Sequence, residues 1–122
     1  MIVSFGNKVR AETFDDFLDY AETYCQAGEE QAGGVLAGVV FEDTIRRMCR
    51  EQNIPDRGQD LDQLIIALGR RSLITGQQSK QARVAAHVRN KATHALWDEY
   101  ELDGVAATIE LTRTFLREHL GG

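Results

Sequence analysis

An arginine and a histidine five residues apart, Arg89 and His94, are the side chains in this sequence best suited to chemistry. A guanidinium binds two phosphate oxygens at once and keeps its charge, while an imidazole takes up or releases a proton near neutral pH. Asn90 follows the arginine directly and adds a polar group. These residue types suit metal-independent chemistry on a phosphodiester, which requires a base, an acid and cationic donors.

The charge around this pair is unusual for a chain whose net charge is −5. Residues 63–97 contain no Asp or Glu and carry +6, so the rest of the chain carries −11. The overall acidity argues against a protein that coats nucleic acid by bulk electrostatics, but the basic stretch suits an anionic ligand. The alternative is a solvated helix face whose acidic partners lie on neighbouring helices. The cations of the stretch are Arg70, Arg71, Lys80, Arg83, Arg89 and Lys91.

Helical periodicity over residues 82–96 predicts how Arg89 is presented. At about 100° per residue, Arg89 leaves the middle of an alanine-rich face that should pack inward. A guanidinium is rarely buried without a partner, so we expect Arg89 either to pair with a carboxylate or to line a cavity for an anion. Glu42 and Asp43 are the candidate carboxylates, because they lie in the middle of the most apolar predicted helix.

A second, polar line follows another side of the same predicted helix. Arg83, His87, Asn90 and His94 are spaced i, i+4, i+7 and i+11, a pattern that the solvated face of a helix also produces. Arg89 and His94 are about 140° apart on an ideal helix. They therefore reach one small site only if the helix ends or distorts between them, or if two subunits build the site.

The remaining sequence predicts an all-α fold, an up-and-down bundle of four to five helices in a single domain over residues 1–122. Strand alternation and hairpin turn pairs are absent. The expected helices begin near residues 14, 29, 60, 76 and 103, with caps at Thr13, Asp60 and Thr75 and a stop at Gly28.

Three glycines within the second predicted helix, Gly33, Gly34 and Gly38, predict a close approach by another backbone, since each costs up to about 1 kcal/mol in an exposed helix. They lack the lysine and preceding strand of a phosphate-binding loop. Cys25 and Cys49 occupy apolar helical positions and are expected to be reduced core residues. The sequence suggests no metal site and no cofactor.

Neither a membrane span nor a secretory signal is expected. No apolar run approaches the roughly 18 residues of a span, and the first residues lack a basic region followed by a long apolar one. A cytoplasmic location is the resulting expectation.

The segment Val88–His94 resembles the signature of the HEPN superfamily, in which a histidine follows an arginine after four to six residues, often with a polar residue directly after the arginine. The helical layout is also similar, with the motif late in a bundle and a further helix after it. Ala32–Asp43 resembles the second helix of several HEPN families, which is small and apolar with an acid near its middle.

The resemblance implies a homodimer whose motif helices face each other. Many HEPN proteins are metal-independent ribonucleases of toxin–antitoxin, phage-defence or RNA-processing systems. Arg89 and His94 would then form the catalytic pair, Asn90 would be a supporting polar group, and Glu42 would orient Arg89. The remaining candidates, expected to contact RNA, are Arg83, His87 and Lys91.

Two other interpretations stay open. Some HEPN proteins have lost activity and serve as modules that bind RNA, a nucleotide or a partner protein, such as an antitoxin. Alternatively, the chain is an unrelated bundle in which Arg89 only forms an ion pair with Glu42 or Asp43. The sequence also departs from the HEPN families controlled by a nucleotidyltransferase antitoxin, because Leu96 stands where those families have a tyrosine.

Overall fold

The structure, a computed structural model, describes residues 5–121, with side chains from Thr13 onward. Five α-helices pack together, and the described residues contain no strand, as the sequence predicted. The helices are α1 (Phe5–Gln26), α2 (Glu30–Glu51), α3 (Leu61–Arg70), α4 (Gly76–Thr93) and α5 (Leu102–His119), and a short 3₁₀ turn, η1 (Trp97–Glu99), precedes α5.

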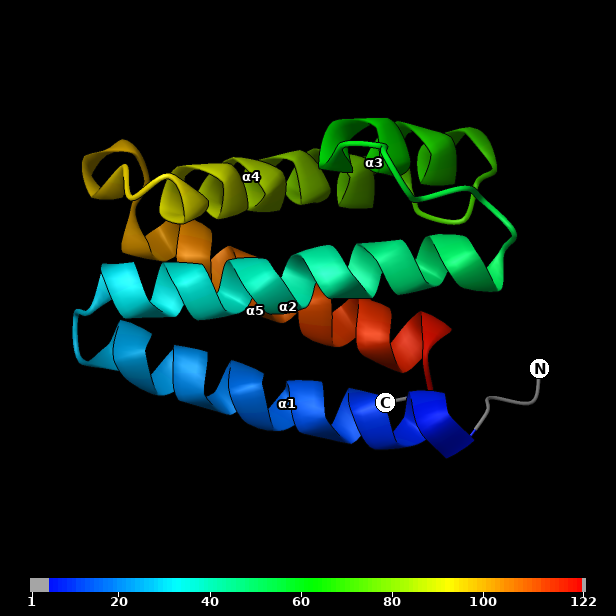
Figure 1. Cartoon of the computed structure of the whole chain (residues 1–122). Coiled ribbons are helices and arrows are strands. Elements are labelled where there is room, and N and C mark those ends of the chain that lie inside the picture. Colours follow the sequence, from blue (N-terminus) through cyan, green and yellow to red (C-terminus); the bar gives the residue numbers. More distant parts are fainter. Residues whose placement is uncertain (1–4, 122) are drawn as a thin grey trace.

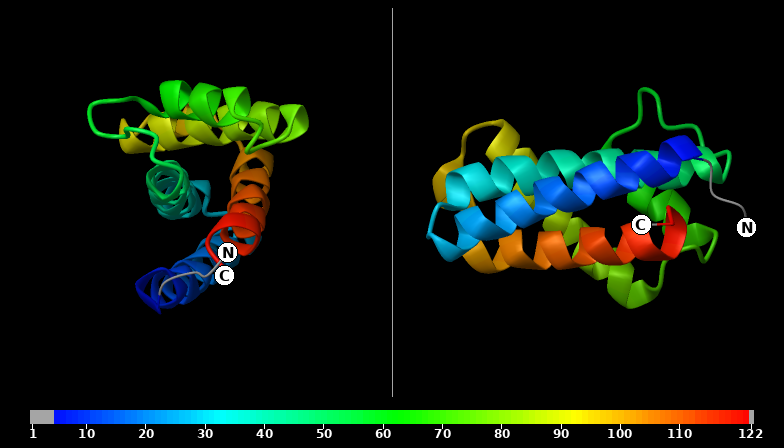
Figure 2. Two further views of the ribbon diagram at one scale, coloured as in Figure 1. Left: turned by 90° about the vertical axis from the view of Figure 1, so that its right-hand side faces the viewer. Right: turned by 90° about the horizontal axis from the view of Figure 1, so that it is seen from below.

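The helix α2 is central and contacts α1, α3, α4 and α5. It runs antiparallel to α1, α5 packs against both, and α4 crosses obliquely with the short α3 beside it (Figures 1 and 2). None of the helices described combines the length and hydropathy that a membrane crossing requires.

The starts of α3 and α4 follow the predicted capping signals. The Asp60 carboxylate accepts a hydrogen bond from the backbone of Gln63 at 2.9 Å, and the Gln63 side chain accepts one from the Asp60 backbone at 3.0 Å. Thr75 and Gln78 form the same reciprocal pair at 3.0 Å in each direction. Both boxes satisfy backbone N–H groups that have no partner within the helix, so these two helix starts are confirmed.

The start of the first helix was predicted wrongly. α1 begins at Phe5, so Thr13 lies inside the helix rather than at its N-cap. No proline interrupts residues 5–12, and most of their side chains are compatible with a helix, so nothing stops the helix at Thr13. The predicted stop is confirmed, because Gly28 has a φ of 75°, a conformation that suits glycine.

The helix α4 is held by its alanine face and by glycine on α2. Ala82, Ala85, Ala86 and Ala92 are buried, as their spacing predicted. A Cβ atom on Gly38 would lie only 3.0 Å from the Arg89 Cα atom, so the backbones of α2 and α4 approach each other here. This contact confirms the close approach expected from the glycine cluster and places Arg89 directly over α2.

Candidate functional site

Arg89 reaches from α4 to a carboxylate of α2. Its Nε atom donates to Glu42 Oε1 at 3.0 Å, its Nη2 atom lies 2.7 Å from the same oxygen, and its Nη1 atom donates to Asn90 Oδ1 at 3.0 Å. Asp43, the other candidate carboxylate, accepts instead from Arg47 on its own helix at 2.8 Å. Glu42 and Asn90 therefore fix the orientation of the Arg89 guanidinium.

Glu42 is shared between two arginines. Its Oε2 atom accepts from Arg46 Nε at 3.1 Å, and Arg46 also donates to the backbone oxygens of Asp56 at 2.7 Å and Gln59 at 3.0 Å. We call Glu42, Arg46, Arg89 and Asn90 the Glu42 cluster. Because two guanidinium groups face one carboxylate, the cluster carries a net charge of +1.

The Glu42 cluster is still accessible. The side chains of Arg89, Glu42 and Arg46 are 26%, 23% and 22% exposed. A guanidinium has five N–H donors, and contacts within the described chain use one each on Nε, Nη1 and Nη2. Nη1 and Nη2 each keep one N–H, so Arg89 is held in place and can still receive an anion.

His94 stands at the end of α4. It is the C-cap residue, and the helix stops there because Ala95 adopts a φ of 56° and the Leu96 N–H donates to the Lys91 carbonyl at 2.8 Å. The helix α4 thus ends at Thr93, directly before His94. The His94 side chain is exposed and has no hydrogen bond or ion pair with any residue from 13 to 121. A single chain thus does not join it to Arg89.

Two of the expected RNA contacts already have partners in η1. His87 Nε2 lies 3.0 Å from the Glu99 carbonyl oxygen, which only accepts, so this nitrogen carries the proton. Lys91 Nζ lies 3.3 Å from the Glu99 carboxylate. Both side chains therefore also hold η1 against α4.

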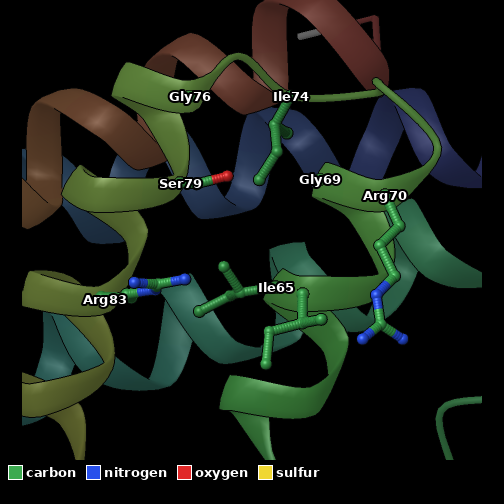
Figure 3. A pocket seen from close by; sticks show the side chains of 8 residues that line it. Ile65, Gly69, Arg70, Ile74, Gly76, Ser79 and Arg83 are labelled. Carbon is green, nitrogen blue, oxygen red and sulfur yellow. The ribbon is translucent and has the colours of Figure 1, made fainter.

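Arg83, the third expected RNA contact, does not contact η1. It lines a hollow between α3 and α4 whose volume is about 310 Å³, together with Arg70 and Ser79 (Figure 3). This hollow could not be recognised from the sequence. Its only signal was the stretch without acids over residues 63–97, which contains both arginines.

Neither cysteine is part of the candidate site. Cys49 is buried, and burial raises the pKa of its thiol to about 11. Burial also raises the pKa of the half-buried Cys25, with a smaller contribution from Glu22. Both thiols are free and stay protonated at neutral pH, which suits a core role. In the described part of the chain, no three His, Cys, Asp or Glu side chains gather closely enough to hold a metal ion.

Comparisons of this chain with protein-family models, with curated proteins and with solved structures found no match. The all-α architecture is established by the structure, whereas the resemblance to the HEPN superfamily stays a prediction. A function has to be argued from the side chains of Arg89, His94 and their neighbours.

Proposed function

We propose that this chain is a metal-independent endoribonuclease of the HEPN type, with a composite active site at a homodimer interface. Arg89 binds the scissile phosphate and His94 acts as general acid or base. The observation that carries the proposal is the Arg89 guanidinium, which Glu42 and Asn90 orient at a partly exposed surface while N–H donors remain for a ligand.

The proposal requires two subunits because Arg89 and His94 do not meet within one chain. A second copy related by a two-fold axis brings the partner's imidazole to the arginine and supplies two histidines, one as base and one as acid. Exposed apolar side chains near both residues support such an interface. Val35 and Val39, which are 41% and 58% exposed, share a face of α2 with Glu42, and Leu96, next in chain to the His94 turn, is 40% exposed.

The chemistry follows from these residue types. The base takes the proton of a ribose 2′-hydroxyl, the 2′-oxygen attacks the adjacent phosphorus, and the bond from phosphorus to the 5′-oxygen breaks as the acid protonates that oxygen. The products are a 2′,3′-cyclic phosphate and a 5′-hydroxyl end. Arg89 stabilises the charge on the phosphate oxygens in the transition state, an effect worth roughly 10²–10³ in rate.

A second candidate is a HEPN-fold module without catalysis that binds RNA, a nucleotide or a partner protein such as an antitoxin. The Arg89–Glu42 contact also supports this candidate. Glu42 is contacted by two of the three guanidinium nitrogens of Arg89, and the His94 side chain does not contact Arg89. A module of this kind binds without cleaving, and its affinity for RNA falls steeply as salt increases.

Cleavage and binding of labelled RNA, measured in the presence of EDTA, distinguish the two candidates. The purified chain is compared with Arg89→Ala, His94→Ala and the control Arg57→Ala, which removes an exposed arginine in the loop before α3. The ribonuclease cleaves and leaves a cyclic phosphate, both site variants lose cleavage, and the control keeps it. Salt-sensitive binding without cleavage supports the module instead. The absence of both cleavage and binding overturns the ribonuclease and the RNA-binding form of the module.

A further inference from the structure

The hollow between α3 and α4 combines an apolar floor with cationic walls. Its volume of about 310 Å³ is at the lower end of the range of roughly 300–1,000 Å³ for small-molecule sites. Ile65 and Ile74 are buried, while Ile66, which also lines the hollow, is 41% exposed. Figure 3 shows Arg83 extending from α4 toward α3, while Arg70 extends downward in the view from the end of α3, on the opposite side from Arg83. The hollow therefore has room for one small ligand.

The two arginines of this hollow differ from most of the other arginines and lysines whose side chains the structure describes. The side chains of Arg70 and Arg83 make no hydrogen bond or ion pair with another residue among 13–121, and no Asp or Glu lines the hollow. The hydroxyl of Ser79, one helical turn before Arg83, is likewise not hydrogen-bonded within that part of the chain. The arginines that instead pair with carboxylates are Arg46, Arg47, Arg50, Arg89 and Arg113.

We propose that this hollow binds a phosphate ester with a flat apolar body, which is the chemistry of a nucleoside monophosphate. Arg83 and Ser79 donate to the phosphate oxygens, and the exposed Ile66 contacts the base. Arg70 adds a second donor or stacks its planar guanidinium on the base. The absence of acids from the lining removes the repulsion that a phosphate would otherwise meet.

This site is separate from the Glu42 cluster. Arg83 precedes Arg89 by six residues, which is about 9 Å along an ideal helix and about 120° around it. The ligand of this hollow is either a free mononucleotide or a nucleotide that flanks the cleavage site of a bound RNA. The site does not require that the protein cleave RNA.

The test is a titration of the full chain with adenosine 5′-monophosphate, with inorganic phosphate and adenosine as separate ligands. Binding is expected, with adenosine at least tenfold weaker. Arg83→Ala and Arg70→Ala each weaken binding roughly tenfold or more, because each removes a guanidinium that contacts the ligand. Lys80→Ala is the matched control, since it removes the same charge from an exposed position of α4 outside the lining, and it changes the affinity less than about threefold.

An equal loss of affinity in Lys80→Ala and Arg83→Ala overturns the proposal in favour of diffuse attraction. The proposal also fails if adenosine binds as tightly as adenosine monophosphate, or if the monophosphate does not bind at all. A short RNA lacking a terminal phosphate distinguishes the sources. If this RNA competes with the monophosphate, and Arg83→Ala abolishes the competition, the hollow binds a nucleotide that flanks the cleavage site. If only the monophosphate binds, the ligand is a free mononucleotide. Arg83 is exposed, so a melting curve identical to that of the parent chain confirms that its variant folds.

Discussion

Two arginines of the same helix have different surroundings, and the difference explains how a stretch without acids is balanced. Arg89 lies over α2, where Glu42 compensates its charge. Arg83 lies toward α3, which has no acid after Asp62, and its charge is not compensated by any described residue. The interpretation with acidic partners on neighbouring helices is therefore confirmed for Arg89, whereas an anionic ligand near Arg83 stays a prediction. Neighbouring acids balance the basic stretch where α4 meets α2, and an open cationic hollow remains where α4 meets α3.

The largest expected effect is that of His94→Ala on RNA cleavage. Removing a general acid or base lowers the rate by about 10²–10⁴. Because the side chain is exposed and makes no bond within the described chain, the melting temperature should not change. Initial rates in EDTA, measured beside Arg57→Ala, check this. Cleavage at the parent rate in the variant would remove His94 from the mechanism.

Arg89→Ala should lower cleavage by about 10²–10³. Its stability cost should be about 1 kcal/mol, since Glu42 keeps Arg46 as a partner and is not left as an unpaired charge. Urea denaturation gives the cost, with Arg47→Ala as a control that breaks a comparable pair on α2. A loss of about 2–5 kcal/mol, as for a truncated core residue, would instead make Arg89 a structural residue.

Gly38→Ala tests the contact that places Arg89 over α2. The new methyl group would meet the Arg89 Cα atom at 3.0 Å, and a backbone atom cannot move aside as a flexible side chain does. We expect a stability loss of about 1–3 kcal/mol by urea denaturation. Gly76→Ala is the control, because a Cβ there has no atom within 4 Å and should cost nothing. Equal stabilities of the two variants would contradict the close packing of α2 and α4.

Asp56→Asn should have the smallest effect, and that effect should depend on pH. Hydrogen bonds from Arg50 hold the pKa of the Asp56 carboxyl below its usual range. The folded state thus favours the carboxylate, so its contribution is complete above the unfolded pKa of about 4 and is lost as pH falls through the lower folded pKa. Unfolding free energies should differ by up to about 1 kcal/mol at neutral pH, since Arg50 is half exposed.

The difference in unfolding free energy between Asp56→Asn and the parent chain should shrink toward zero in acid. Asp16→Asn, at an exposed position of α1, is the control. A difference that stays constant from neutral pH to acid would mean that the carboxylate charge contributes nothing. The result also bears on the Glu42 cluster, because the Asp56 carbonyl accepts a hydrogen bond from Arg46.

The parts of the structure that local rules govern could be predicted from the sequence. The capping boxes at Asp60 and Thr75 depend on side chains three residues away, and the buried face of α4 follows from helical spacing. The Arg89–Glu42 pair was also predicted as one of two choices, because a guanidinium on an inward face needs a carboxylate on the central helix.

What depends on the packing of distant segments could not be predicted. The bonds from His87 and Lys91 to Glu99 depend on how the chain turns back after α4. The stretch without acids marked Arg70 and Arg83 as cations, but only the packing of α3 against α4 shows that they line one hollow. Thr13 shows the converse, since a good capping residue does not start a helix where the preceding residues already continue it.

The most direct test of the composite site is a mixture of two inactive variants. Arg89→Ala and His94→Ala are unfolded and refolded together, so that mixed dimers form, and cleavage of labelled RNA is measured in EDTA against each variant refolded alone. A shared cleft predicts that the mixture cleaves faster than either variant, because only the mixed dimer brings an intact arginine to an intact histidine. Its rate stays below that of the parent chain, because water must replace the missing second histidine as acid or base. A mixture no more active than the two separate variants, with mixed dimers demonstrably present, would contradict a site built from both subunits.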